Sequence, residues 1–86
     1  MQIHNVRPLP QTGSGRWRDV AMFDAEIVDG FRVIGLKLAL APDGKRFVFT
    51  PQRQGQRFAQ IRGDYARRLS DAAWQALEAV SHDNNR

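Results

Sequence analysis

The sequence predicts an α+β domain: an antiparallel β-meander of four or five strands with one C-terminal helix packed on it. Two observations predict this order. From Ile3 to Thr50 the apolar residues alternate with polar ones or form short runs, whereas beyond Asp64 they recur with the period of a helix. Turn-forming residues separate the short runs. With 86 residues there is room for one domain, expected over 1–81 and followed by a frayed polar tail at 82–86.

The first half of the chain has the pattern of three strands. A first strand is expected over 3–9, where Pro8 and Pro10 stop it. In a second, over 17–28, small and apolar side chains occupy every other position, as in a half-buried strand. Asp29-Gly30 is typical of a tight hairpin turn, which leads into an apolar third strand over 31–41. Because this third strand is apolar on both faces, we expect a second subunit to cover the face that the helix leaves open.

A fourth strand and a helix complete the predicted domain. Pro42-Asp43-Gly44 predicts a turn, the segment 45–50 predicts a short strand, and the polar segment 51–56 predicts a loop. Asp64 is a plausible N-cap for the helix. Six apolar positions then form one stripe along an amphipathic helix: Leu69, Ala72, Ala73, Ala76, Leu77 and Val80.

The charges of the chain are segregated along the sequence. Residues 45–68 hold seven of the thirteen basic side chains against one acidic side chain, Asp64, a net charge of +6. The 44 residues before this block are balanced, and the last 18 carry −2. A concentrated positive field on an otherwise balanced small domain is typical of a protein that binds a polyanion, most often nucleic acid. A solvated surface explains such a block equally well without a partner.

Composition argues against several other classes of protein. The chain has no cysteine, and His4 and His82 lie at opposite ends, so we expect no metal site, no cofactor and no disulfide. No segment approaches the roughly 18 apolar residues of a membrane span, and residues 1–10 lack a signal-peptide pattern. We therefore expect a cytoplasmic protein with no membrane partner. A core this small gains from oligomerisation, which favours a homodimer.

Scattered motifs along residues 1–80 resemble one family. The segments that carry the resemblance are Val6-Arg7, Gly15-Arg16-Trp17-Arg18, Phe31-Arg32-Val33-Ile34-Gly35, Phe47-Val48 with Pro51, and a basic stretch leading to Phe58 and Ile61. In this order they resemble the SpoVG family, the sporulation stage V protein G type of small bacterial regulator. The resemblance implies a dimer of antiparallel sheets, each with a C-terminal helix. It also implies site-specific binding to DNA, and in some members to RNA, in transcription regulation.

The family's nucleic-acid contacts are attributed to basic residues just after the proline that ends the fourth strand. Pro51-Gln52-Arg53-Gln54 occupies that place here. Arg53 fits the family pattern, whereas Gln54 stands where the family usually has a second basic residue. Glutamine can bind an adenine edge but cannot neutralise a phosphate, and Arg57 is expected to supply the missing charge.

The remaining basic residues of the block support this site. Arg62, Arg67 and Arg68 lie near the expected start of the helix, where the helix dipole disfavours cations unless an anion joins them. Lys45 and Arg46 follow the turn before the fourth strand. The expected nucleic-acid-binding residues are thus Lys45, Arg46, Arg53, Gln54, Arg57, Arg62, Arg67 and Arg68.

Two other functions were weighed. In the first, the protein is a non-catalytic interaction protein whose basic face binds an acidic protein partner. In the second, Asp24 and Glu26 act as a catalytic pair, but no nucleophile or metal set accompanies them, so we predict no enzyme, no catalytic residue and no small-molecule substrate. Four aromatic residues are candidates for base stacking: Trp17, Phe58, Tyr65 and Trp74. We expect packing in the core or an interface instead, most firmly for Trp74.

Overall fold

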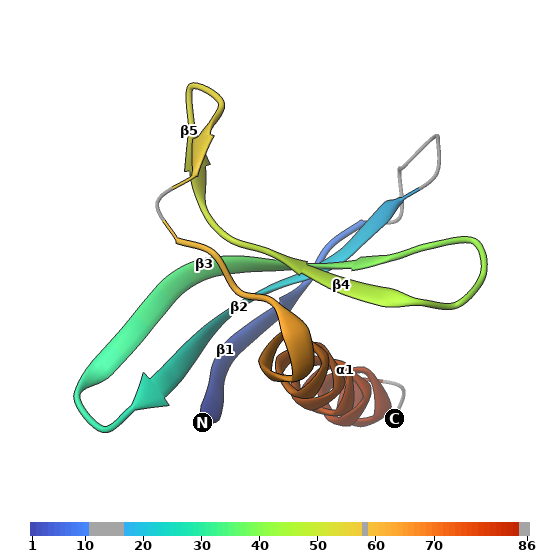
Figure 1. Cartoon of the computed structure of the whole chain (residues 1–86). Helices are drawn as coiled ribbons and strands as arrows, with labels where there is room; N and C mark the ends of the chain where they lie inside the picture. The colour runs from blue at the N-terminus through green and yellow to red at the C-terminus, as the bar shows by residue number, and fades with distance from the viewer. Residues whose placement is uncertain (11–16, 58, 85–86) are drawn as a thin grey trace.

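Four strands form one antiparallel sheet in a computed structural model that describes residues 1–10, 17–57 and 59–84. Neighbouring strands follow each other along the chain, so the sheet is a meander, as the sequence predicts (Figure 1). One helix lies against it, which confirms the α+β class. The strands are β1 (Gln2–Pro8), β2 (Arg18–Val28), β3 (Phe31–Leu40) and β4 (Arg46–Phe49), and the helix is α1 (Gly63–Asn84).

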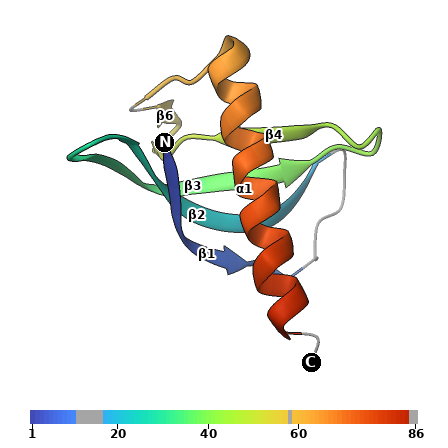
Figure 2. The same ribbon diagram turned by 90° about the horizontal axis from the view of Figure 1, so that it is seen from below.

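The core lies between α1 and one face of the sheet. Figure 2 shows α1 crossing the strands on that face. Phe23 of β2 and Leu36 and Leu38 of β3 are fully buried there, and Leu69 of α1 packs against them. Half of the predicted helix stripe belongs to this core, namely Leu69, Ala73 and Leu77, whereas Ala72, Ala76 and Val80 are half-buried beside it. We call the other side of the sheet the open face.

Two strand irregularities surround Asp24, whose neighbours Phe23 and Ala25 belong to the core. Alternation along β2 therefore places Asp24 on the open face, yet it is buried. The register shifts in β1 after His4 and in β3 next to Asp24, and Asn5 and Gly35, which lie in these shifts, have φ of 56° and 82°. The Gly35 backbone N–H donates to Asp24 Oδ1 at 3.0 Å, and the Asn5 side chain donates to Oδ2 at 3.4 Å. Both neighbouring strands thus bend to satisfy one buried carboxylate.

The four expected strands are observed within one residue of their expected ends, and three other expectations differ from the structure. The segment 51–56 forms most of a second, two-stranded sheet and is not a loop: β5 (Gln52–Arg53) pairs with β6 (Gln56–Arg57). Asp64 lies in the first turn of α1, and the helix begins one residue earlier, at Gly63. The helix also continues to Asn84, so the expected frayed tail is helical over most of its length. No helix among the described residues is long and apolar enough to cross a membrane.

Candidate nucleic-acid interface

The β5–β6 hairpin stands away from the rest of the molecule. In Figure 1 it projects from the open face, opposite α1. Gln52 pairs with Arg57 and Arg53 pairs with Gln56, so each arginine lies opposite a glutamine in the register. At the base of the hairpin the Thr50 hydroxyl donates to the Ala59 carbonyl at 2.8 Å. This bond ties the segment that enters the hairpin to the one that leaves it.

The tip of the hairpin has an uncommon conformation. Gln54 and Gly55 have φ of 53° and 78°, as a two-residue type I′ turn requires. Asparagine and glycine adopt this left-handed region readily, whereas glutamine does so at a cost of about 1 kcal/mol. The tip therefore presents an exposed polar side chain, that of Gln54, on a tight turn. The side chains of Arg53 and Arg57 lie outside the part of the chain that the structure describes.

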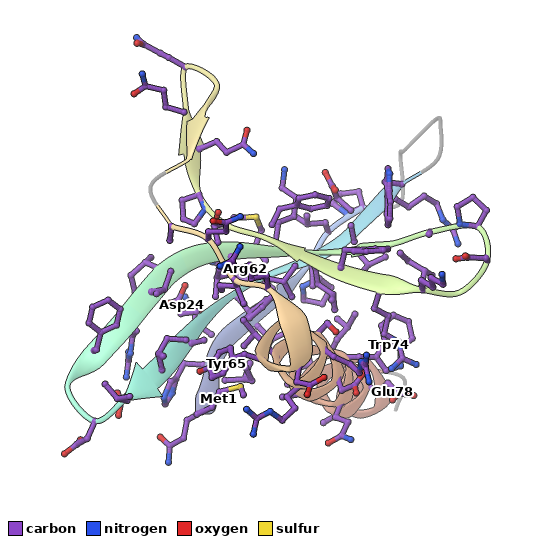
Figure 3. The ribbon with its side chains drawn as sticks, in the orientation of Figure 1. Met1, Asp24, Arg62, Tyr65, Trp74 and Glu78 are labelled. Carbon is purple, nitrogen blue, oxygen red and sulfur yellow. The ribbon has the colours of Figure 1, made fainter. Side chains whose placement is uncertain are left out.

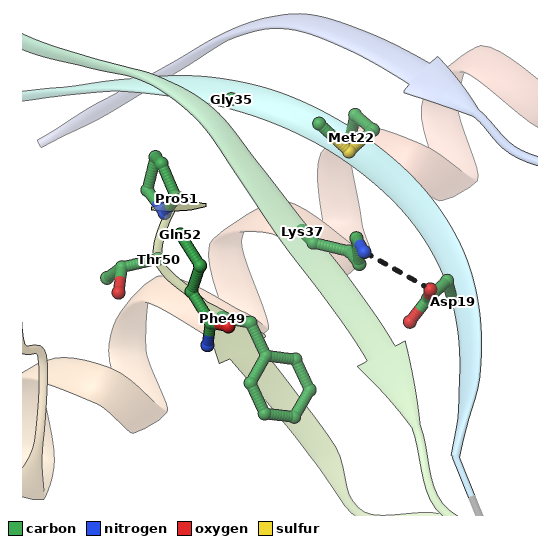
Figure 4. A pocket seen from close by; sticks show the side chains of 8 residues that line it. All are labelled: Asp19, Met22, Gly35, Lys37, Phe49, Thr50, Pro51 and Gln52. Carbon is green, nitrogen blue, oxygen red and sulfur yellow. Dashed lines mark ion pairs between the residues drawn. The ribbon is translucent and has the colours of Figure 1, made fainter. Parts of the chain in front are cut away.

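A hollow of about 390 Å³ lies on the open face beside the base of the hairpin (Figure 4). Its floor is a row of paired positions, with Met22 of β2 next to Lys37 of β3 and Lys37 next to Phe49 of β4. The Lys37 amine lies 3.4 Å from the Asp19 carboxylate, and Gln52 of β5 lines the hollow near the hairpin. A carboxylate, an ammonium, an amide and an aromatic ring thus share one concave surface.

Aromatic rings gather next to this hollow. Val48 packs against the core, so alternation along β4 puts Phe47 and Phe49 on the open face. The Trp17 ring meets Phe47 edge to face at 4.2 Å between centroids, and it meets Phe49 at 6.1 Å. Trp17 and Phe47 remain 39% exposed, while Ala39, opposite Phe47 in the register, is fully buried. The cluster therefore covers the sheet and still presents ring surface to solvent.

The basic residues near the start of α1 do not form one cluster. Arg62 is exposed and has no ion pair with any described residue (Figure 3). Arg67 is exposed and lies 3.9 Å from the Asp64 carboxylate, while the Arg68 guanidinium lies 5.6 Å from the centre of the Tyr65 ring. The Tyr65 ring packs against the core and its hydroxyl is buried. Tyr65 is therefore a packing residue and is not placed to stack on a base.

Lys45 and Arg46, adjacent in sequence, have different surroundings. The Lys45 side chain is 73% exposed, and among the described residues its amine forms one long ion pair, with Asp43 at 4.0 Å. Arg46 lies 3.5 Å from the Asp71 carboxylate of α1 and 4.5 Å from the centre of the Trp74 ring. It therefore holds α1 against β4. Trp74 packs against the core on one side and Arg46 on the other, in agreement with its expected packing role.

The structure therefore divides the eight expected binding residues into three groups. Arg53, Gln54 and Arg57 belong to the hairpin. Lys45, Arg46 and Arg67 line a groove of about 600 Å³ between β4 and α1, while Arg62 and Arg68 lie outside it.

Four open-face residues are not among the binding residues expected from the sequence: Lys37, Phe49 and Gln52, which line one hollow, and Phe47, which meets Trp17 beside it. The alternation of Phe47-Val48-Phe49 was the available signal, because it puts both rings on one side of a strand.

The acidic pair that was weighed as catalytic has structural partners. Besides its bonds to Asn5 and Gly35, Asp24 lies 3.6 Å from the Arg7 guanidinium, and Glu26 lies 3.4 Å from that of Arg32. In the part of the chain that the structure describes, no three His, Asp or Glu side chains are grouped so as to hold a metal ion.

No family model, no curated protein and no solved structure matches this chain.

Proposed function

We propose that the protein is a site-specific nucleic-acid-binding regulator that acts as a homodimer and makes its main contacts through the β5–β6 hairpin. The proposal rests on one observation: the hairpin projects from the molecule and is rich in arginine and glutamine. Its six residues, 52–57, are three glutamines, two arginines and a glycine, and the segment 44–63 around it contains no acidic residue. A projecting cationic hairpin with no internal counter-charge is suited to a polyanion.

The chemistry of the hairpin suits both parts of a nucleic-acid contact. An arginine guanidinium binds a phosphate, or the O6 and N7 atoms of guanine, with two hydrogen bonds. Glutamine binds adenine N6 and N7 in the same two-bond manner. A two-stranded ribbon is also narrow enough to enter the major groove of a duplex. The SpoVG resemblance puts the family's contact at this same place in the sequence.

Three further basic residues add exposed positive charge outside the hairpin. Arg62 is free of ion pairs among the described residues, and the pairs of Lys45 and Arg67 are long and exposed. Exposed ion pairs contribute little to stability, so a phosphate replaces such an acidic partner at small cost. Arg46 differs, because its guanidinium is already held by Asp71 and Trp74.

A salt titration tests the proposal. If the dimer neutralises about five phosphates, the logarithm of the binding constant falls against the logarithm of salt concentration with a slope of roughly −4 to −5. The double variant Arg53→Gln/Arg57→Gln removes four arginines from the dimer and should make that slope shallower by roughly three to four units. The control compares two single variants, Arg57→Gln and Arg32→Gln, which remove the same charge. Arg32→Gln should change the slope less, because Arg32 pairs with Glu26 away from the hairpin. An unchanged slope in the double variant would reject the hairpin as the site.

A second part of the proposal concerns the dimer. Large apolar side chains are strongly exposed at the end of the sheet where β2 turns into β3: Val28 (61%), Phe31 (58%) and Ile34 (59%). Met1 is 46% exposed at the start of β1. A second copy would cover these apolar side chains. Light scattering tests the assembly, since a particle of 9.8 kDa at working concentration would contradict a dimer.

One observation supports a different partner. The groove between the outer strand β4 and α1 is lined by Lys45, Arg46 and Arg67 against one acidic residue, Asp71, and a groove with an excess of basic side chains beside a sheet edge suits an acidic extended peptide. This function predicts no binding to duplex DNA, single-stranded DNA or RNA at low salt.

A further inference from the structure

We propose that the open face between Trp17 and the β5–β6 hairpin is a stacking platform for single-stranded nucleic acid. The inference rests on the proposed function and specifies its ligand. The hairpin supplies charge and base edges, while the open face holds two or more unstacked bases beside it.

The exposed aromatic rings on this face can stack on the bases of a single strand but not on the bases of a duplex. In a duplex the faces of the bases are stacked on each other, so aromatic side chains reach only unpaired bases. Phe47 and Phe49 lie on one side of β4 and Trp17 meets both rings edge to face, which leaves 39% of Trp17 and of Phe47 exposed. Helix packing does not need these rings, because the core lies on the other face.

Two hollows lie beside the rings, one near the turn that precedes β4 and one near the base of the hairpin. One, of about 400 Å³, is bordered by Trp17, Phe47 and Lys45, and the other, of about 390 Å³, is bordered by Phe49, Lys37 and Gln52. Each is comparable in size to a small-molecule pocket, which begins at about 300 Å³. Phe47 and Phe49 lie two residues apart on β4, between the turn at one end and the base of the hairpin at the other.

Charge on the open face favours a nucleic acid over a second protein subunit. Lys37 and Asp19 form an ion pair at the floor of the second hollow, and Lys45 and Asp43, which form a long pair at 4.0 Å, both border the first. A second subunit packed here would have to bury the Lys37–Asp19 pair, which is costly without further partners. A single strand leaves such a pair partly hydrated and brings phosphates to the lysines. The surface at the β2–β3 turn also borders an ion pair, Arg32–Glu26 at 3.4 Å, but it exposes three large apolar side chains, Val28, Phe31 and Ile34, and suits a second copy better.

The test compares one substitution at two ends of the same sheet. Phe47→Leu and Phe49→Leu keep apolar volume but remove the ring, and each should weaken binding to a 12-nucleotide oligo(dT) or oligo(U) roughly tenfold. Phe31→Leu makes the same change at the β2–β3 end, which stays apolar, so the affinity of protein that light scattering shows to have the parent's assembly state should change less than about twofold. A duplex of equal length should bind all three variants with the affinity of the parent protein. Thermal melting of each variant shows that it is folded.

Tryptophan fluorescence gives a second measurement that does not depend on affinity. In a Trp74→Phe background Trp17 is the only tryptophan, and stacking of a base on this cluster should quench its emission on addition of oligo(dT).

Each outcome has a separate meaning. Binding of single strands with no loss in Phe47→Leu and Phe49→Leu and no quenching would overturn the platform and leave the hairpin proposal standing. Dissociation of the dimer by Phe47→Leu, without an effect on single strands, would assign the face to a second copy and overturn the platform. No binding of any nucleic acid at low salt would overturn the proposed function and the platform with it.

Discussion

The two faces of the sheet are built from the same strands but differ in chemistry. The face under α1 is aliphatic and aromatic, and Phe23, Leu36 and Leu38 are completely buried on it. The open face combines rings, an ion pair and a buried carboxylate: Phe47 and Phe49, Lys37 with Asp19, and Asp24. The covered face accounts for the stability of the fold, whereas most of the open face is not needed for it. The difference indicates where a partner binds.

The largest expected effect on stability comes from removing a core side chain on the face under α1. Phe23→Ala should lower the free energy of unfolding by about 4 kcal/mol, because it leaves a large cavity under α1. Phe47→Ala, which removes a ring of the same size from the open face, should cost only about 1 kcal/mol. Urea denaturation measures both values. Equal losses would mean that the open face is as important for folding as the core.

Asp24 is the exception on the open face, since it is buried and satisfied by both neighbouring strands. Asp24→Ala should cost about 2 kcal/mol because the Gly35 N–H loses its partner in a buried site. Asp24→Asn keeps an oxygen acceptor and should cost about half as much, again by urea denaturation. If alanine and asparagine destabilise equally, the Gly35 hydrogen bond does not account for the two bent strands.

Lys45 and Arg46 are neighbours in the sequence, but only Arg46 is expected to contribute to the stability of the fold. Arg46→Gln should lower the free energy of unfolding by about 1 kcal/mol, since it removes the ion pair with Asp71 and the contact with the Trp74 ring. Lys45→Gln should change it by less than about 0.5 kcal/mol, because that side chain is exposed. Differential thermal melting of the pair checks the contrast. A larger loss for Lys45→Gln would reverse these roles.

The smallest expected effect is at the hairpin tip. Gln54→Asn should raise the free energy of unfolding by roughly 0.5 kcal/mol, because asparagine adopts the left-handed conformation more readily than glutamine. If the Gln54 side chain also contacts a base, the same variant should bind nucleic acid more weakly although it is more stable. A decrease in stability would show that the turn is not the type I′ turn that we describe.

Much of the fold follows from local patterns in the sequence. The alternation in β2, the turns at 29–30 and 42–44, and the helix stripe are each set by residues close together in the chain, and all appear in the structure. The β5–β6 hairpin was expected as a loop because 52–57 has no apolar alternation and its tip is Gln-Gly, not the common Asn-Gly.

Other features depend on residues far apart in the sequence. The bends at Asn5 and Gly35 arise from a shared contact with Asp24, and the position of Arg46 arises from Asp71 and Trp74, about 25 residues later. The block of basic residues indicated a polyanion as partner. Which of its arginines belong to the hairpin and which one, Arg46, packs against α1 depends on tertiary contacts, so it could not be predicted from the sequence. The cluster of rings on the open face could not be predicted either, because Trp17 and Phe47 come together only when the strands have paired.

Backbone amide shift mapping tests most directly whether the open face and its hairpin, and not the helix side, bind nucleic acid. On addition of oligo(dT) to the isotope-labelled protein, the largest changes should fall at Phe47, Phe49, Gln52 and Gly55. Changes should be small at Gln75 and Glu78, which are exposed on α1. Changes confined to the exposed side of α1, with none on β4 or the hairpin, would contradict the account.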